Sequence, residues 1–301
     1  MKIISTLILS FLSLIGCASK QAVNTSAEHG VPFSYAGRYL IKIPVTLNET
    51  HPTYFIFDTG IGVNLLSKSL CENFGCTIQS SHTGQRMSGQ KITVPMSQIN
   101  SLTFAGQKIE SIPTGVWEMK GFLPPDEDCK NVEGFLSLGF FRKIPFTMDY
   151  KKKLFFIETA ESLKVRKSKG FVIPITIDED GPAVTIFMPL KLSDGSTIKV
   201  EIDLGGDILT LNRKLMPTVG ADPKAKGVLI EKQKDETGHP YVRYYTGIKG
   251  PIAPAAAPNL QQSNLKVMFQ DIIYDGLIAN DFMKRFTVTY DLANSEIILE
   301  P

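Results

Sequence analysis

From Tyr35 onward the chain alternates short apolar runs with turn-forming residues. Gly, Pro, Asn and Asp separate the runs, which include YLIKIPVTL, TYFIFDTG, KITVPM and KLFFIE. Runs of this length favour β-strands, because a strand is typically about five residues long whereas a helix needs about ten or more. The pattern therefore predicts an all-β fold made of many short strands.

Only two stretches carry helix signals. Ser67 can cap a short helix over SKSLCENFG, which Gly75 would end. A second stretch, NRKLMPTVG, begins at Asn212 and is weakened by Pro217, because proline removes a helical hydrogen bond. The helical content is therefore expected to be small.

The chain divides into two halves. A polar segment over residues 158–170, ETAESLKVRKSKG, shows no hydrophobic alternation and predicts the connection between them. With 301 residues the chain is long enough for two domains of ordinary size. The first domain is expected over residues 33–160 and the second over residues 171–301.

The two halves repeat each other. FIFDTGIGVNLLS and VEIDLGGDILTLN align Asp58 with Asp203, an offset of 145 residues (203 − 58). Later, GFLSLGFFRKIPFTMDY and GLIANDFMKRFTVTYDL align Gly134 with Gly276, an offset of 142 residues (276 − 134). Two motif pairs in the same order and at nearly the same offset predict an internal duplication of a unit of about 130 residues.

Asp58 directly follows an apolar run, and a charge at the end of a buried strand is costly without a partner. The duplication supplies that partner in Asp203. Like charges about 3 Å apart cannot both ionise, so such a pair shares a proton. The ionised carboxylate can then take a proton from a water between the two, and the other can donate to a carbonyl oxygen. This chemistry hydrolyses an amide without a metal or a covalent intermediate.

The neighbouring residues suit such a pair. Gly60 and Gly205 would let the two backbones turn tightly and approach closely. Thr59 would supply a hydroxyl that braces one half against the other. These supporting residues are therefore predicted to lie beside the two aspartates.

Together these motifs resemble the aspartic peptidases of the pepsin and retropepsin type, and the lobes look closest to the retropepsin-like domains of bacterial proteins. The resemblance rests on apolar-apolar-Asp-Thr-Gly at 56–60, on Leu65-Leu66-Ser67, and on the late apolar-apolar-small segment before a Phe. It covers residues 33–301. It implies two lobes, each a small closed β-barrel with one or two short helices, and each supplying one aspartate.

The resemblance also implies flaps, which are hairpins that close over the cleft between the lobes. The first would lie near residues 83–90 and contain Gly84 and Gly89. The second would lie around residues 244–247 and contain Gly247. An extended peptide or protein substrate would lie in the cleft, and no cofactor is implied.

The second half departs from the family pattern. Leu204 stands where the family has Thr or Ser, so the bracing hydroxyl is lost there. Ser137 and Ala279 stand where glycine is common, and both are small. Two functions remain open: an aspartic endopeptidase, or a catalytically inactive retropepsin-fold protein that binds peptides or a protein partner. A site formed between the first lobes of two chains is a third arrangement, but the duplication within one chain favours a monomer.

The N-terminus predicts export. Lys2 precedes an apolar run over residues 3–15 that is short for a membrane span and typical of a signal peptide. The run ends in Leu-Ile-Gly-Cys17, which resembles the lipobox of bacterial lipoproteins; an ordinary secretory signal is the alternative. Residues 1–17 would be the signal peptide, Cys17 the lipidation site and 18–32 a flexible tether. Ala18 implies the periplasmic side of the outer membrane.

The cysteine count, the charge balance and the histidine spacing limit the disulfides and ligands that can be expected. Export to an oxidising compartment allows one disulfide among the three other cysteines, with the pairing left open: Cys71, Cys76 and Cys129. With 32 basic and 30 acidic residues, the chain has no basic patch that would indicate nucleic acid binding. The four histidines are scattered and form no ligand pair at helical spacing, so no metal is expected.

Overall fold

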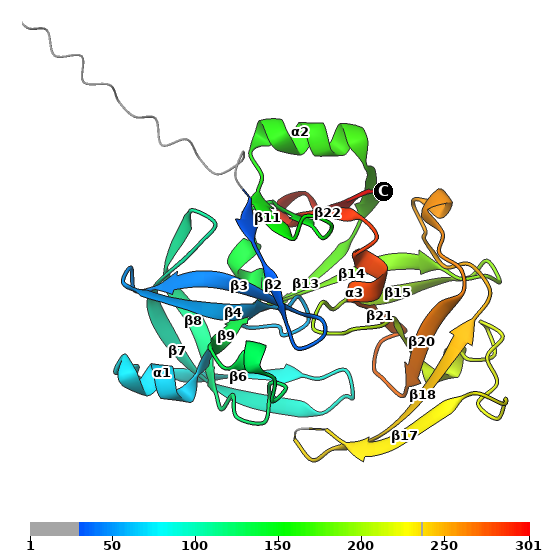
Figure 1. The fold of residues 1–301 in the computed structure, drawn as a ribbon, viewed down its shortest axis with the longest axis horizontal. Helices are drawn as coiled ribbons and strands as arrows, with labels where there is room; N and C mark the ends of the chain where they lie inside the picture. The colour runs from blue at the N-terminus through cyan, green and yellow to red at the C-terminus, as the bar shows by residue number, and fades with distance from the viewer. Residues whose placement is uncertain (1–29, 236) are drawn as a thin grey trace, which may run out of the picture.

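The computed structural model describes residues 30–235 and 237–301, and its strands form three sheets (Figure 1). The all-β prediction is confirmed. The predicted signal peptide, the lipidation site Cys17 and most of the tether lie outside the described residues. The tether prediction extends too far, because Val31–Pro32 form strand β1 and pair with Leu154 and Phe155.

The first half forms an eight-stranded sheet that closes on itself. In spatial order its strands are β2 (Ser34–Ala36), β3 (Leu40–Leu47), β4 (His51–Phe57), β9 (Val132–Leu136), β5 (Leu65–Ser67), β8 (Gln107–Trp117), β7 (Lys91–Phe104) and β6 (Ser80–Gln85). The long β7 pairs with β6 at one end and with β3 at the other. The pairing of β3 with β7 closes a six-stranded barrel, as the resemblance implies.

The second half repeats this order strand for strand. Its strands are β13 (Thr176–Asp180), β14 (Ala183–Lys191), β15 (Thr197–Ile202), β21 (Gly276–Ile278), β16 (Thr210–Asn212), β20 (Leu265–Gln270), β18 (Pro240–Ile248) and β17 (Leu229–Lys234). Strand directions also match, since β4–β9 and β15–β21 are both parallel pairs. The counterpart of β7 is broken, so the short β19 (Ala253–Pro254) pairs with β14 in its place. The sheets of the two halves thus have the same strand order.

A third sheet joins the halves. Its order is β1 (Val31–Pro32), β11 (Leu154–Ile157), β10 (Phe146–Asp149), β22 (Thr287–Asp291), β23 (Glu296–Glu300) and β12 (Phe171–Pro174). At its centre Thr147 lies opposite Thr289, and their hydroxyl oxygens are 2.6 Å apart. These threonines are aligned in the sequence repeat, so the approximate twofold relation between the halves passes near this pair.

Helices are few, as expected. The α-helices are α1 (Lys68–Asn73), α2 (Ala160–Lys169) and α3 (Asn280–Met283), and the 3₁₀ turns are η1 (Glu127–Cys129), η2 (Leu138–Phe141), η3 (Arg213–Leu215), η4 (Pro258–Leu260) and η5 (Leu292–Asn294). The first predicted helix is confirmed: Ser67 Oγ accepts from the Leu70 N–H at 3.2 Å, and Gly75 follows with φ of +64°. The second predicted helix is reduced to η3. No helix in the described part of the chain is long and apolar enough to cross a membrane.

Helix α2 occupies the segment predicted to connect the two halves. It lies over the third sheet (Figure 1) and buries none of its residues, so it has no apolar stripe that periodicity could reveal. Its start is fixed by the Thr159 and Ser162 side chains, each of which pairs with the other residue's backbone N–H. Arg166 then pairs with Glu158 and Glu300, so ion pairs rather than apolar burial dock this helix.

An aromatic core supports the first motif. Phe57 makes edge-to-face contacts with Phe141, Phe146 and Phe155 at centroid distances of 5.4 to 5.5 Å. These rings come from β4, η2 and the third sheet, and all are fully buried. Because Phe57 immediately precedes Asp58, this packing fixes the end of the strand that carries the aspartate.

Candidate active site

Equivalent backbone bonds hold the two aspartates at the ends of equivalent strands. Asp58 follows β4, and its N–H donates to the Leu136 carbonyl at 3.1 Å. Asp203 follows β15, and its N–H donates to the Ile278 carbonyl at 2.8 Å. Each aspartate is thus tied to the late segment of its own half.

The structure brings the two predicted aspartates together. Asp58 Oδ1 accepts from the Gly60 N–H at 2.8 Å, and Asp203 Oδ1 accepts from the Gly205 N–H at 2.9 Å. A methyl group at Gly205 would lie 2.5 Å from Asp58 Oδ2, and one at Gly60 would collide with the Asp203 carboxylate. Each glycine therefore leaves the space that the aspartate of the other half fills, and the two carboxyl groups are hydrogen-bonded.

The pair shares a proton at neutral pH. Burial first, and then the charge of Asp203, raise the pKa of Asp58 to about 8. Burial also raises the pKa of Asp203, while the Gly205 N–H and the hydrogen bond from Asp58 hold it down. Protons leave such a pair jointly, so the shared proton belongs to the pair rather than to one member.

The Thr59 side chain of the first half forms hydrogen bonds to the backbone of the second half. Its Oγ1 donates to the Ile202 carbonyl at 2.6 Å and accepts from the Leu204 N–H at 2.9 Å. Both partners belong to the second half and are fully buried. Leu204 has no hydroxyl with which to return this contact, so the second aspartate loop depends on other bonds.

Two buried asparagines hold the segments around the aspartates through hydrogen bonds, and neither was predicted from the sequence. Asn280 Nδ2 donates to the carbonyls of Leu204 at 2.6 Å and Gly206 at 3.0 Å. In the first half, Asn64 Oδ1 accepts from the N–H and hydroxyl of Ser137, at 2.9 and 3.1 Å. The available signal was an amide inside an apolar run, as in VNLL and LIAND. Asn64 follows its aspartate, whereas Asn280 reaches back from the late segment.

The small residues of the late segments fit the close packing expected of them. Ser137 is fully buried and Ala279 almost so. A methyl group at Gly206 would already lie 3.2 Å from the Ala279 Cβ. A larger residue at position 279 would therefore press on the second aspartate loop.

Two hairpins, one from each half, meet at their tips. The β6–β7 hairpin turns at residues 86–90, so Gly84 lies in its strand and Gly89 in its tip, with φ of +85°. The β17–β18 hairpin turns after Lys234, so Gly247, which lies in β18 opposite Lys266 of β20, is away from the tip. Residues 244–247, predicted to contain the second flap, therefore lie at the end of β18 that is far from the turn.

Polar contacts join the two hairpin tips. Arg86 Nη1 lies 3.6 Å from Asp235 Oδ2, and the Thr237 hydroxyl donates to Gln90 Oε1 at 3.0 Å. The Met87 carbonyl also accepts from the Ile273 N–H at 2.9 Å. These contacts hold the tips of the two hairpins together.

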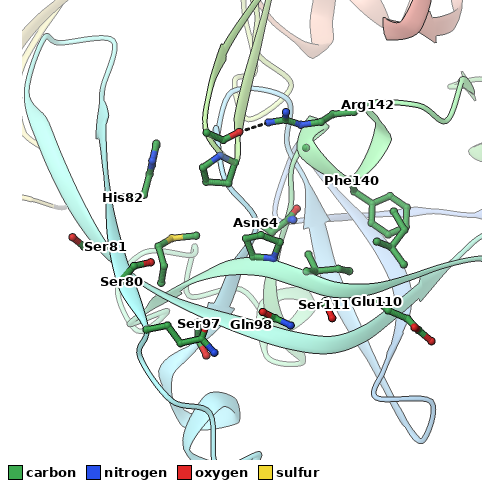
Figure 2. Close-up of a pocket in the computed structure, with 18 residues that line it drawn as sticks. Asn64, Ser80, Ser81, His82, Ser97, Gln98, Glu110, Ser111, Phe140 and Arg142 are labelled. Carbon is green, nitrogen blue, oxygen red and sulfur yellow. Dashed lines mark hydrogen bonds between the residues drawn. The ribbon is translucent and has the colours of Figure 1, made fainter.

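A cavity of about 600 Å³ lies beside the first flap (Figure 2). His82 and Ser80 line it from β6, Phe140 lines it from η2, and Arg142 lines it from the position directly after η2. Arg142 also donates to the Gly181 carbonyl of the second half at 2.6 Å. Neither aspartate lines this cavity, so it offers space where the halves meet but is not itself the carboxyl site.

The fold and the paired carboxyls define a class: an all-β protein of the aspartic-peptidase-like fold. In agreement, residues 43–139 match the family model described as "Aspartyl protease". The matched segment contains Asp58, Thr59 and Gly60 and supports a retropepsin-like aspartyl protease domain in the first half. No curated protein matches the chain.

Proposed function

We propose that this protein is an aspartic-type endopeptidase. The observation that carries the proposal is the mutual fit of Asp58 against Gly205 and of Asp203 against Gly60. A structural carboxylate in a turn needs only local N–H donors. Two buried carboxyls held against each other, with raised pKa values, are instead suited to general acid–base catalysis.

The mechanism follows from the protonation of the pair. A water between the two carboxyls would lose a proton to Asp203 as it attacks the peptide carbonyl carbon. Asp58 would donate its proton to the carbonyl oxygen, giving a neutral tetrahedral intermediate. On collapse the C–N bond would break as Asp203 returns its proton to the amine nitrogen, and a hydroxyl of the intermediate would give a proton back to Asp58, which restores the starting pair. The reaction needs no cofactor.

The substrate would enter as an extended peptide. β6 and β17 are the outermost strands of their sheets, so each has an unpaired edge. An added peptide strand can satisfy such an edge with backbone hydrogen bonds. The flap tips must separate first, which costs only the few polar contacts between them.

We further propose that the protein acts as a monomer in the bacterial envelope, anchored through Cys17 on the periplasmic side of the outer membrane. One chain supplies both aspartates, which supports the monomer. The lipobox-like sequence supports the anchor. Labelling of cells with a radioactive fatty acid should mark the parent protein and not a Cys17→Ser variant; equal labelling of both would contradict the anchor.

One observation favours a second candidate, an inactive peptide-binding lipoprotein. Leu204 is fully buried where a bracing hydroxyl would stand, so the site has lost one of its two reciprocal contacts. Such a protein would bind peptides in the cleft without turning them over.

Asp58→Asn tests the enzyme proposal. The amide keeps the shape of the carboxyl but cannot exchange protons, so peptide cleavage should fall to background while the circular dichroism spectrum is unchanged. Cleavage of a proteome-derived peptide library is measured by mass spectrometry between about pH 3 and 8, the range in which such a pair carries one proton. A folded variant that cleaves as fast as the parent would refute the mechanism. A parent that binds statine-containing peptides but cleaves none would favour the second candidate.

A further inference from the structure

A third buried acid, Glu201, lies beside the two aspartates. Glu201 lies in β15, two residues before Asp203, which directly follows the strand. Alternate residues of an extended chain point to the same face. Val200 and Ile202 point into the barrel core, so Glu201 points out of it with Asp203. Burial, followed by the charges of Asp203 and Asp58, raises the pKa of Glu201 well above its ordinary range. Glu201 is therefore close enough for the charges of both aspartates to raise its pKa.

Glu201 is buried without a partner. It is 5% exposed. Among the residues that the structure describes, none donates a hydrogen bond to its carboxyl or forms an ion pair with it. Lys199 lies on the same face, but its Nζ pairs with Asp178 at 3.6 Å. Because its carboxyl oxygens are not fully enclosed, a ligand could reach them and supply the donor that the described residues do not.

Aromatic rings flank this carboxyl. Phe187 lies directly opposite Glu201 on β14, and Tyr274 packs edge-to-face on Phe187 at 5.1 Å. Glu201 is also the charge that most raises the pKa of Tyr274, after burial. The Lys199 ammonium already lies 4.2 Å from the Phe187 ring centre. Rings beside an acid accept the aliphatic stem and the cationic end of a Lys or Arg side chain.

The first half has a different surface at the same place. Glu201 aligns with Ile56, at the same offset of 145 residues (201 − 56) as the aspartates. Ile56 is buried in an apolar cluster with Phe135, against which Trp117 and Phe122 pack. Residues 118–131 cover this face, whereas only residues 271–275 link the corresponding strands of the second half. The two halves therefore differ at this position: the first carries a covered apolar residue and the second carries an acid.

We propose that Glu201 binds the ammonium or guanidinium group of a substrate Lys or Arg residue next to the scissile bond. The proposal rests on the proposed peptidase function for the position of the peptide. The protein would thus prefer a basic residue over an apolar one on the second-half side of the scissile bond.

The test compares side chains that differ only in charge. A peptide that the parent cleaves is resynthesised with Lys, Arg or norleucine at each position flanking the cut. The parent should prefer Lys or Arg at one position by about 10- to 100-fold in kcat/KM, the range expected for a hydrogen bond to a charged group. Glu201→Gln should bring the ratio near one, and Glu201→Ile, which copies Ile56, should favour norleucine. Glu161→Gln, on the exposed face of α2, should behave as the parent does.

Binding separates this inference from the enzyme proposal. Two statine-containing hexapeptides, with Lys or norleucine next to the statine, are titrated by calorimetry into the parent and the Glu201→Gln variant. Tighter binding of the Lys peptide that is lost in the variant supports the inference even if the parent cleaves nothing. Equal binding or cleavage of the paired peptides by the parent, or a preference that survives in Glu201→Gln, overturns it.

Discussion

Thr59→Val removes one hydroxyl from the boundary between the halves and leaves the side-chain shape almost unchanged. The hydroxyl donates to the Ile202 carbonyl at 2.6 Å and accepts from the Leu204 N–H at 2.9 Å. Both residues are fully buried, so water cannot replace the lost partner. Each backbone group left without a partner costs about 1–3 kcal/mol, and a carbonyl is the more tolerant of the two. We therefore expect the free energy of unfolding to fall by about 2–4 kcal/mol.

Urea unfolding measures this loss. The single tryptophan, Trp117, reports the first half by fluorescence, and far-ultraviolet circular dichroism reports the strands of both halves. Coincident curves are required before a free energy is assigned. The matched control is Thr197→Val, an exposed position on β15, which should change stability by no more than about 0.5 kcal/mol. If Thr59→Val loses no more than the control, Thr59 does not brace the halves.

Two further predictions concern titratable groups. Because the pKa of Asp58 is raised to about 8, the folded protein holds a proton that the unfolded chain releases near pH 4. The resulting stabilisation is complete below pH 4 and lost as the pH rises through about 8. The melting temperature should therefore fall more steeply between pH 5 and 9 in the parent than in Asp58→Asn, and parallel curves would contradict the shared proton. Burial and a hydrogen bond with Cys76 raise the pKa of Cys71 to about 12. On mild oxidation we expect these two thiols to form the disulfide; non-reducing peptide mapping that instead finds Cys129 in the bridge would refute this pairing.

The first aspartate could be predicted from sequence because its signals are local. Apolar residues, Asp-Thr-Gly and the Ser67 cap follow one another without interruption, and each reflects the backbone of its own segment. The second aspartate was found only through the repeat, because Leu204 interrupts its motif. The internal repeat therefore identified Asp203, which its local sequence pattern alone could not.

Other features depend on contacts between distant segments. The role of Asn280 arises only when the late segment folds back onto the loop after Asp203. Helix α2 carries no apolar stripe because ion pairs hold it. The second flap tip depends on which residues of β17 and β18 pair, and alternation alone does not fix that register. Each of these features depends on a contact with a segment distant in the sequence, which the local residue pattern does not specify.

The shared third sheet also explains why the halves can differ. In a symmetric dimer of one repeat, every substitution would appear on both sides of the cleft. Here β10 and β22 make the central pairing within a single chain, with Thr147 against Thr289. Each copy of the gene segment can then diverge separately. Thr59 retains its hydroxyl while Leu204 has none, and Glu201 stands in the second half where the first half has Ile56. Covalent linkage thus frees the active site from symmetry, so that one half can specialise without the other.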